Sequence, residues 1–485
     1  MKPDFLRRLV QGGGLSLVKL VTGLAKIKVL AALLGVEGLG LLSLALQFQA
    51  TAVGLVSMSL AVGVINIGRP LWVRDDAEAA GAVLGTALSI VAINALLFLA
   101  AFALFQYAFD GAVISSFEAH GPGLLWLIAL AAVVVSFANV LWEGLSFLVD
   151  RFDVYVRTNI VASFFDAILF SGGAWLFGLK GALVASLFSS LSLFAIYTVF
   201  SARAPAVRRI LVQIGVARHW VRPLFSYSVL MLTTTAVGLA CMFFARAYLT
   251  ATSGEAANGY LQVVTALAAY MLPFVMTGVW GHLHPTAAAS GDSEIARLEL
   301  RRTLVASMRL ASAGCVAVVV GAPLLVQLVY SSAFLAARQY IPVYFAGELC
   351  FILVSVMGVY LLAVGKKWAY FIGYTLYHAT LLGGVVWLAE SAGPWAYVIA
   401  HMAGATLVAV PAIAYGLRSS MLDAPTLKTV AICTGAAAIC CWLDYLQVSL
   451  DLMLVSIRAS WLLGPVLILF VLYPYFLKVW HRGLQ

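Results

Sequence analysis

Long uninterrupted runs of apolar residues dominate the pattern of hydrophobic and polar positions along this chain. Each run has the length, about 20 residues or more, that an α-helix needs to cross a bilayer. Because the runs are continuous and do not alternate, they exclude a β-barrel. We therefore predict an all-α polytopic membrane protein with about 14 transmembrane helices. The runs fall near 12–34, 39–66, 80–108, 122–149, 154–178, 180–201, 221–249, 258–281, 303–332, 340–364, 367–389, 392–417, 427–447 and 452–479.

An internal repeat divides the predicted helices. Gly63–Pro70 closes the second helix with the pattern G-V-x5-P, and Gly278–Pro285 closes the eighth with the same pattern. An even number of helices separates the copies, so the halves keep their orientation and are expected to be related by an axis along the membrane normal. We predict two pseudo-symmetric six-helix lobes and an appended helix pair. The predicted parts are an N-terminal lobe at 1–201, a basic cytoplasmic linker at 202–220, a C-terminal lobe at 221–417, and transmembrane helices 13 and 14 within 418–485.

Glycines are concentrated between the first two predicted helices, at Gly35–Gly40. A phosphate-binding loop would need a preceding strand and a following helix. Here the glycines join two membrane helices, so we predict a tight turn.

The basic residues are distributed unevenly among the loops. The chain has 485 residues, of which 63% are hydrophobic and 10% charged, and a net charge of +9. Of its 29 Lys and Arg residues, 21 fall at the N-terminus and in alternate junctions, 2 in the opposite loops and 6 inside predicted spans. This bias predicts that both termini are cytoplasmic. The basic balance therefore reflects topology, and we expect no nucleic acid to bind.

Three lysines, Lys19, Lys26 and Lys28, lie inside the first predicted helix. A lysine near the centre of a span costs roughly 2.5–3.5 kcal/mol to insert. Lys19 and Lys26 are a heptad apart and share one helix face, whereas Lys28 points nearly the opposite way. The shared face is expected to meet water or an anionic ligand. For Lys28, snorkelling to the outer surface is the alternative.

Three acids lie inside other predicted spans, at Asp166, Glu348 and Glu143. Asp166 lies about 12 residues, or about 18 Å, from the cytoplasmic end of its helix. At that depth its side chain does not easily reach either surface. Carboxylates inside a membrane mark ion pathways or pair with cations, and a structural lysine partner stays open for Asp166. Glu143 alternatively snorkels to the inner surface. We predict that these acids couple an ion or line a cavity.

Three tyrosines, Tyr370, Tyr374 and Tyr377, follow one face of the eleventh predicted helix. Tyrosine rings can stack on sugar rings while their hydroxyls hydrogen-bond, so we predict sugar contacts here. Ordinary aromatic packing is the alternative.

The sequence shows no arrangement typical of catalysis. No nucleophile lies beside a base, and no His or Cys spacing suits a metal ion. The predicted outer loops are too short to hold an active site, which disfavours a glycan polymerase or ligase. We therefore predict a transporter and not an enzyme.

Several short motifs resemble, in their order, the Wzx-type flippases. These form part of the polysaccharide transporter branch of the multidrug/oligosaccharidyl-lipid/polysaccharide (MOP) exporter superfamily, and the lipid III and O-antigen flippase group is the most similar. The motifs are Leu17-Val-Lys19, Lys28-Val-Leu-Ala, Leu34-Gly-Val-Glu-Gly-Leu-Gly40, Gly63-Val-Ile-Asn66, Gly178-Leu-Lys-Gly181-Ala, Leu230-Met-Leu-Thr, Ser332-Ala-Phe334 and Gly347-Glu348.

The resemblance implies a function. Such proteins move an undecaprenyl-pyrophosphate-linked oligosaccharide, such as an O-antigen, enterobacterial common antigen or exopolysaccharide repeat unit. They move it from the cytoplasmic to the periplasmic leaflet of the bacterial inner membrane, by alternating access between two lobes around a cationic cavity. An H+ or Na+ gradient is the implied driving force, with no cofactor. The implied partners are a glycan polymerase and chain-length proteins, and the chain is expected to be a monomer.

The resemblance also implies roles for particular charged residues. Positions where similar charges recur in the family are occupied by Lys19, Lys28, Arg246, Arg338 and Glu348. We predict that Lys19, Lys26, Lys28 and Arg246 bind the substrate in the cationic cavity. For Lys26 this prediction rests on its shared face with Lys19 alone.

Two alternative functions stay open. The lipid III group ends after twelve helices, whereas fourteen also occur in capsule and exopolysaccharide members and in peptidoglycan precursor flippases. A lipid II flippase is therefore one alternative. The other is a multidrug or cation antiporter of the same superfamily, which is expected to need acidic groups in its first lobe.

Overall fold

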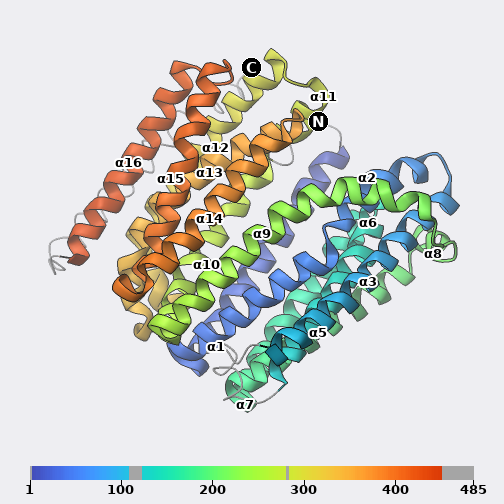
Figure 1. Cartoon of the computed structure of the whole chain (residues 1–485), viewed down its shortest axis with the longest axis horizontal. Coiled ribbons are helices and arrows are strands. Elements are labelled where there is room, and N and C mark those ends of the chain that lie inside the picture. Colours follow the sequence, from blue (N-terminus) through green and yellow to red (C-terminus); the bar gives the residue numbers. More distant parts are fainter. Residues whose placement is uncertain (1–2, 109–122, 280–282, 450–485) are drawn as a thin grey trace. The chain divides into compact units, whose positions relative to one another are not determined.

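The computed structural model describes residues 3–108, 123–279 and 283–449. All regular elements within these ranges are helical (Figure 1). Nine segments of the described chain are long and apolar enough to cross a membrane, and two of these hold two helices joined at a sharp turn. The prediction of an all-α polytopic protein is thus confirmed. The fourteenth predicted helix, at 452–479, lies outside the described residues.

The chain divides into two compact units, residues 1–247 and 248–485. The lobes predicted from the sequence repeat stay a prediction, because compactness and repetition are different properties. The first unit holds α1 (Pro3–Ser57), α2 (Leu60–Val73), α3 (Ala77–Ala108), α5 (Leu124–Phe137), η1 (Ala138–Glu143), α6 (Gly144–Leu148), α7 (Phe152–Ala202), α8 (Pro205–Leu211), η2 (Arg218–Trp220) and most of α9 (Val221–Ser253). The second holds α10 (Glu255–Gly278), α11 (His284–Ser290), α12 (Glu294–Val329), η4 (Ser332–Tyr340), α13 (Ile341–Ala363), α14 (Lys367–Ala392), α15 (Trp395–Arg418) and α16 (Ala424–Ser449).

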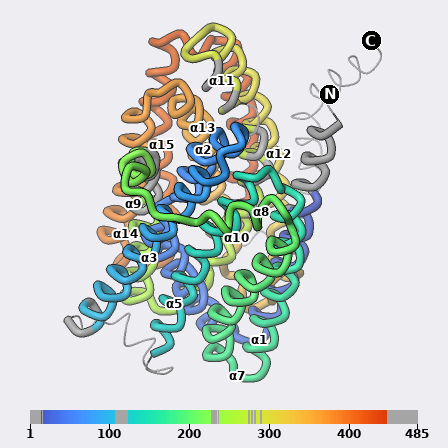
Figure 2. The backbone as a smooth tube through the Cα atoms, turned by 90° about the vertical axis from the view of Figure 1, so that its right-hand side faces the viewer, coloured from blue at the N-terminus to red at the C-terminus, as the bar shows by residue number. Residues whose placement is uncertain are grey.

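Two glycines turn the chain inside α1 and α7. Gly35 has φ 66° and Gly178 has φ 60°, in the left-handed region that glycine enters without steric cost. The tight turn predicted at the start of Gly35–Gly40 is therefore confirmed. Near the second turn, Gly173 and Gly181 face each other so closely that a Cβ on either would overlap the other's backbone. Each of these elements is thus a pair of helices, and α1 packs beside α7 (Figure 2).

The second predicted helix, 39–66, differs from the observed one. The helix breaks at Met58 and Ser59, with φ 48° and 54°, and continues as α2. The left-handed conformation costs a residue other than glycine roughly 1–2 kcal/mol. No glycine or proline marks the site, so the sequence gives no sign of this break.

The fourth predicted helix contains an unexpected π-helical turn, η1, which carries Asn139 and Glu143. Such a turn fits extra backbone into the helix and often lies at functional sites. It changes the direction in which the residues after it point, compared with a regular α-helix.

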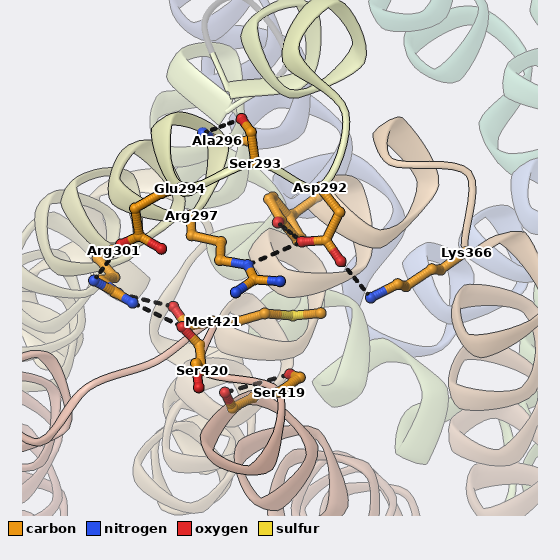
Figure 3. A network of polar contacts seen from close by, with 12 residues as sticks. Asp292, Ser293, Glu294, Ala296, Arg297, Arg301, Lys366, Ser419, Ser420 and Met421 are labelled. Atoms are coloured by element: carbon orange, nitrogen blue, oxygen red, sulfur yellow. Dashed lines mark hydrogen bonds and ion pairs between the residues drawn. The ribbon is translucent and has the colours of Figure 1, made fainter.

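Polar contacts tie helix junctions together within the second unit (Figure 3). Asp292, in the turn before α12, accepts hydrogen bonds from Lys366 Nζ at 2.7 Å, from Arg297 Nε at 3.0 Å and from the Tyr360 hydroxyl at 2.9 Å. Lys366 lies in the turn before α14. Because Lys366 and Arg297 donate to it, the pKa of the Asp292 carboxyl is held well below its usual range.

A third junction joins the same network. Arg301 of α12 donates to the carbonyl oxygens of Ser420 at 2.7 Å and Met421 at 3.0 Å, in the turn before α16. Figure 3 shows both sets of contacts side by side. The ends of α12, α13, α14 and α16 are therefore fastened at one level of the second unit.

Within the first unit, ion pairs also tie the junctions between helices, and one of them has the reversed polarity. Arg69 of α2 pairs with Asp150 before α7 at 3.2 Å, and Arg209 of α8 pairs with Asp75 after α2 at 2.9 Å. In the first of these pairs the earlier junction supplies the cation and the later one the acid, whereas in the second pair the acid, Asp75, comes first. In the second unit, Asp292 supplies the acid to the later cation. The same connection is thus made with either polarity.

Candidate functional site

A polar cavity of about 230 Å³ lies inside the first unit, among α1, α5 and α7. Lys26 enters it from the first helix of α1, and Asp166 from the first helix of α7. Gln49 lies on the second helix of α1. The other polar residues of the cavity wall lie on the second helix of α7 and are Ser186, Ser189 and Ser190. The turns at Gly35 and Gly178 return the chain so that both halves of each helical pair contribute.

Lys26 and Asp166 form an ion pair, with Nζ 2.6 Å from Oδ2. The Ser189 hydroxyl donates to the other carboxylate oxygen at 2.6 Å, and the Lys26 ammonium lies 4.7 Å from the centre of the Phe170 ring. The side chains keep 20% and 31% of their exposure, so both charges remain in contact with the cavity. Each charge lowers the cost of holding the other inside the membrane.

Lys19 lies on the same helix face but makes different contacts. Its ammonium donates to Asn159 Oδ1 at 2.9 Å, and Asn159 Nδ2 donates to the Tyr197 hydroxyl at 2.7 Å. Glu143, half-buried in η1, is the acid whose charge acts on Lys19. The shared face predicted for Lys19 and Lys26 therefore meets two neighbouring polar groups on α7, and the Lys19 side chain stays exposed.

Two further predicted cations lie elsewhere. Lys28 is exposed, while Arg246 on α9 is buried, with 3% of its surface accessible. The wall of the polar cavity contains neither of them, nor Lys19. The structure thus brings Lys26 and Asp166 together and leaves the other predicted substrate cations outside this cavity.

The second unit contains an aromatic cavity of about 390 Å³ among α10, α13, α14 and α15. Tyr370, Tyr374 and Tyr377 all line it. The Tyr370 and Tyr374 rings stack at 5.8 Å, and Phe351 lies 4.6 Å from the Tyr377 ring. The three tyrosines predicted from one helix face are therefore gathered in one place, and their contact with a sugar stays a prediction.

Behind this cavity lies a buried polar chain. The Tyr377 hydroxyl lies 2.7 Å from His401 Nδ1, and His401 Nε2 lies 3.4 Å from Glu348 Oε2. The Tyr344 ring stacks on the His401 ring at 4.2 Å. Glu348, predicted as a coupling acid, thus connects through His401 to the cavity wall. The sequence did not single out His401, because one histidine in an apolar helix does not show which residues it will contact.

Solved structures that resemble this chain share its fold. The lipid II flippase MurJ, in an inward closed conformation, aligns over 98% of this chain and 99% of its own, with a TM-score of 0.69 and 12% identity. An inward-facing multidrug resistance MATE family transporter of the MOP superfamily aligns over 84% and 98%, with a TM-score of 0.62 and 16% identity. The chain has the fold of MOP superfamily transporters.

A further MOP superfamily transporter, from Pyrococcus furiosus, aligns over 85% of this chain and 95% of its own, with a TM-score of 0.51 and 17% identity. No family model and no curated protein sequence matches the chain. At these identities the MOP likeness establishes the fold and leaves the substrate to be argued from the site.

Proposed function

We propose that this MOP-fold chain is a flippase for an undecaprenyl-pyrophosphate-linked oligosaccharide. It carries the lipid from the cytoplasmic to the periplasmic leaflet of the bacterial inner membrane, by alternating access between two lobes, with both chain termini in the cytoplasm. The finer assignment, an O-antigen, enterobacterial common antigen or exopolysaccharide repeat unit, follows the Wzx-type resemblance of the motifs. The observation that carries the proposal is the polar cavity with Lys26 in its wall and Lys19 on the same helix face.

The chemistry of the polar cavity favours an anionic substrate. A pyrophosphate is too strongly hydrated to cross hydrocarbon unaided, and lysine ammonium groups hold phosphate as mobile point charges. Lys26 is held by Asp166 at 2.6 Å, and Lys19 by the neutral side chain of Asn159 at 2.9 Å. Among the described residues no carboxylate forms an ion pair with Lys19, and Lys26 becomes available when Asp166 is protonated or displaced.

An ion gradient is proposed to drive the cycle through the buried acids. Asp166 exchanges Lys26 for a proton or Na+, while Glu348 and Glu143 are the other candidates. A carboxylate that binds Lys26 in one state and an ion in another couples the two events, because each ligand shifts the other's binding equally.

The cation antiporter alternative is disfavoured by the same ion pair. A cationic drug would have to displace Lys26 from Asp166, and Lys19 would repel it. The lipid II alternative is favoured by one observation, the alignment of MurJ over 98% of this chain, against 84% for the MATE transporter. Lipid II would share the pyrophosphate chemistry and differ in its glycan.

Complementation tests the proposal. Lys19→Ala and Lys26→Ala are expressed in flippase-null strains, each of which displays one defined surface glycan or depends on lipid II flipping. Loss of one charge-assisted phosphate contact, worth about 1.5–3 kcal/mol, reduces glycan display by roughly tenfold or more. Lys180→Ala is the matched control, since Lys180 is an exposed lysine beyond the turn of α7.

The outcomes are distinct. Restored glycan display that is lost in both variants but kept in the control supports the proposal. Rescue of a strain that lacks its lipid II flippase transfers the assignment to lipid II. Normal glycan display by both variants at normal membrane levels rejects the cationic site, and efflux of cationic dyes by the wild type would support the antiporter.

A further inference from the structure

The aromatic cavity lies near one end of the second unit's helices. On α14 its wall begins at Ala369, two residues after the helix starts at Lys367. On α15 it extends to Ala412, six residues before the helix ends at Arg418. Both of these helix ends belong to the basic junctions that the network around Asp292 fastens. The cavity is therefore close to the membrane face that carries these cations.

The wall of the cavity is mainly apolar, and its side-chain hydroxyls come from Ser355, Tyr370, Tyr374 and Tyr377. The Ser355 hydroxyl donates to the Phe351 carbonyl oxygen at 2.8 Å, and the Tyr377 hydroxyl is engaged with His401. Much of the remaining wall is apolar, with side chains such as Leu272, Met276, Val354, Met357 and Val408. The two tyrosine hydroxyls of Tyr370 and Tyr374 could pair only part of a sugar, which has a hydroxyl on most of its carbons, and the other sugar hydroxyls would stay unpaired here. The wall suits a hydrocarbon chain.

The mouth of the cavity is basic and interfacial. Ala369 is a wall residue that is also exposed, so the cavity reaches the surface of the unit there. Next to it, Lys367 and Trp368 are exposed, as is Arg418 at the end of α15. Exposed tryptophan is enriched at the level of the lipid headgroups. Among the described residues, no ion pair involves Lys367 or Arg418, whereas Lys366 is taken by Asp292.

We propose that the aromatic cavity binds one hydrocarbon chain of an anionic phospholipid, whose headgroup phosphate lies at Lys367 and Arg418. The apolar wall accounts for the chain and the two exposed cations account for the phosphate. Basic pockets between transmembrane helices select anionic headgroups in this way. The occupant comes from the surrounding bilayer, so the proposal does not depend on which substrate the chain carries.

Photolabelling of the full-length chain in lipid nanodiscs tests this site. The probes are a phosphatidylglycerol and a phosphatidylcholine that carry the same diazirine on one acyl chain, and labelled peptides are mapped by mass spectrometry. The phosphatidylglycerol probe is expected to label peptides of α13, α14 and α15 that line the cavity. Lys367→Gln and Arg418→Gln each reduce this labelling roughly fivefold, the effect of one lipid-facing cation. Lys428→Gln, an exposed cation on α16, is the matched control and leaves it unchanged.

Filling the cavity tests the position of the chain. Ala412→Phe blocks the cavity and abolishes the specific label, while Ala431→Phe, on an exposed position of α16, does not. Ser355→Leu is a second filling variant in case Ala412→Phe disturbs folding, which gel filtration reports.

Three results would overturn the proposal. Equal labelling by the phosphatidylcholine and phosphatidylglycerol probes would show that Lys367 and Arg418 do not select an anionic headgroup. Label that persists after both filling variants places the lipid elsewhere. Displacement of the phosphatidylglycerol label by an undecaprenyl phosphate at equal membrane concentration, or by a soluble oligosaccharide, assigns the cavity to the substrate.

Discussion

At the scale of single residues, the Lys26–Asp166 pair makes a prediction about stability. Both side chains are partly exposed, so the pair is worth less than a fully buried one. Lys26→Met leaves an unpaired carboxylate and is expected to destabilise the chain by about 1–2 kcal/mol. The double variant Lys26→Met/Asp166→Asn removes both charges and restores stability, but it does not restore transport. Thermal unfolding in detergent measures the first effect and glycan display the second.

The outcome separates a structural lysine from a functional one. If the double variant regains transport together with stability, the pair serves folding alone. Lys180→Met supplies the control, because it removes an exposed lysine from α7.

The hydrogen bond between Tyr377 and His401 makes a second prediction. His401 has 1% of its side chain exposed, so water cannot replace the lost partner in Tyr377→Phe. An unsatisfied buried polar group costs about 1–3 kcal/mol, and a lower melting temperature is expected. Tyr445→Phe, which removes a hydroxyl from a half-exposed ring on α16, is the control. Equal melting temperatures for the two variants would contradict the importance of this contact.

At this scale the sequence showed which charged residues need a function or a partner, but it did not show which residues pair with each other. It singled out Lys26 and Asp166 as charges that need a reason to lie in a membrane. It left their partnership open, because the pairing depends on the depth and rotation of α1 against α7. His401 and Ser189 were invisible, since a single polar residue in an apolar helix is uninformative until its neighbours are known.

At the scale of elements, the sequence was informative wherever a helix is long or a glycine makes a turn. Hydrophobic length located the two helices of α7 to within about two residues, and the turn predicted at Gly35–Gly40 was found, whereas α1 begins at Pro3 and ends at Ser57 and not at the predicted 12 and 66. The break at Met58 and Ser59 was missed, because tertiary packing holds these residues in a conformation that their own preferences disfavour. The π-helical turn η1 was missed for the same reason.

The contact between Asp292 and Lys366 makes a third prediction, about how the junctions are fastened. Asp292→Lys places like charges beside Lys366 and Arg297 and is expected to destabilise the second unit by about 1–2 kcal/mol. The exchange Asp292→Lys/Lys366→Asp restores one ion pair and recovers part of that loss. The first unit already shows that the opposite polarity works, through Arg69 and Asp150. Denaturation of single and double variants measures the difference; a double variant no better than Asp292→Lys would contradict the pairing.

The depressed pKa of Asp292 makes a fourth prediction, about acid stability. A carboxyl whose pKa is lower in the folded state stabilises the fold above its unfolded pKa, about 4, and loses that contribution as the pH falls below it. The network around Asp292 therefore contributes fully at neutral pH and weakens only below about pH 4. Asp292→Asn lowers the melting temperature at pH 7 and flattens its decline in acid. If the melting temperatures of the wild type and of Asp292→Asn fall in parallel as the pH is lowered, the Asp292 carboxylate does not stabilise the fold in this way.

At the scale of the whole molecule, the sequence predicted the all-α membrane class, but it did not predict how the appended helix is held. The described part of the pair is α16, which packs against α12 and α13. Arg338 of η4 donates to Asp444 of α16 at 2.9 Å, with 13% and 6% of the side chains exposed. Arg338 was noted for its family position, whereas Asp444 was not noted at all. The contact ties α16 to η4 within the second unit.

Truncation after Asp423 is the fifth prediction, and it follows from that contact. Removing residues 424–485 keeps the contacts of Arg301 with Ser420 and Met421 but takes away the carboxylate that pairs with Arg338. Breaking a buried pair from one side costs about 3–5 kcal/mol, a large part of a domain's stability, so the truncated chain is expected to aggregate or unfold on extraction. Arg338→Met in the truncated chain removes the stranded charge and recovers a measurable part of that loss. In the full-length chain the same substitution strands Asp444 and is destabilising, so its effect changes sign with the length of the chain. The full-length and truncated chains, each with and without Arg338→Met, are compared by monodispersity and melting temperature. If Arg338→Met has the same effect in the full-length and the truncated chain, α16 is not a structural part of the unit.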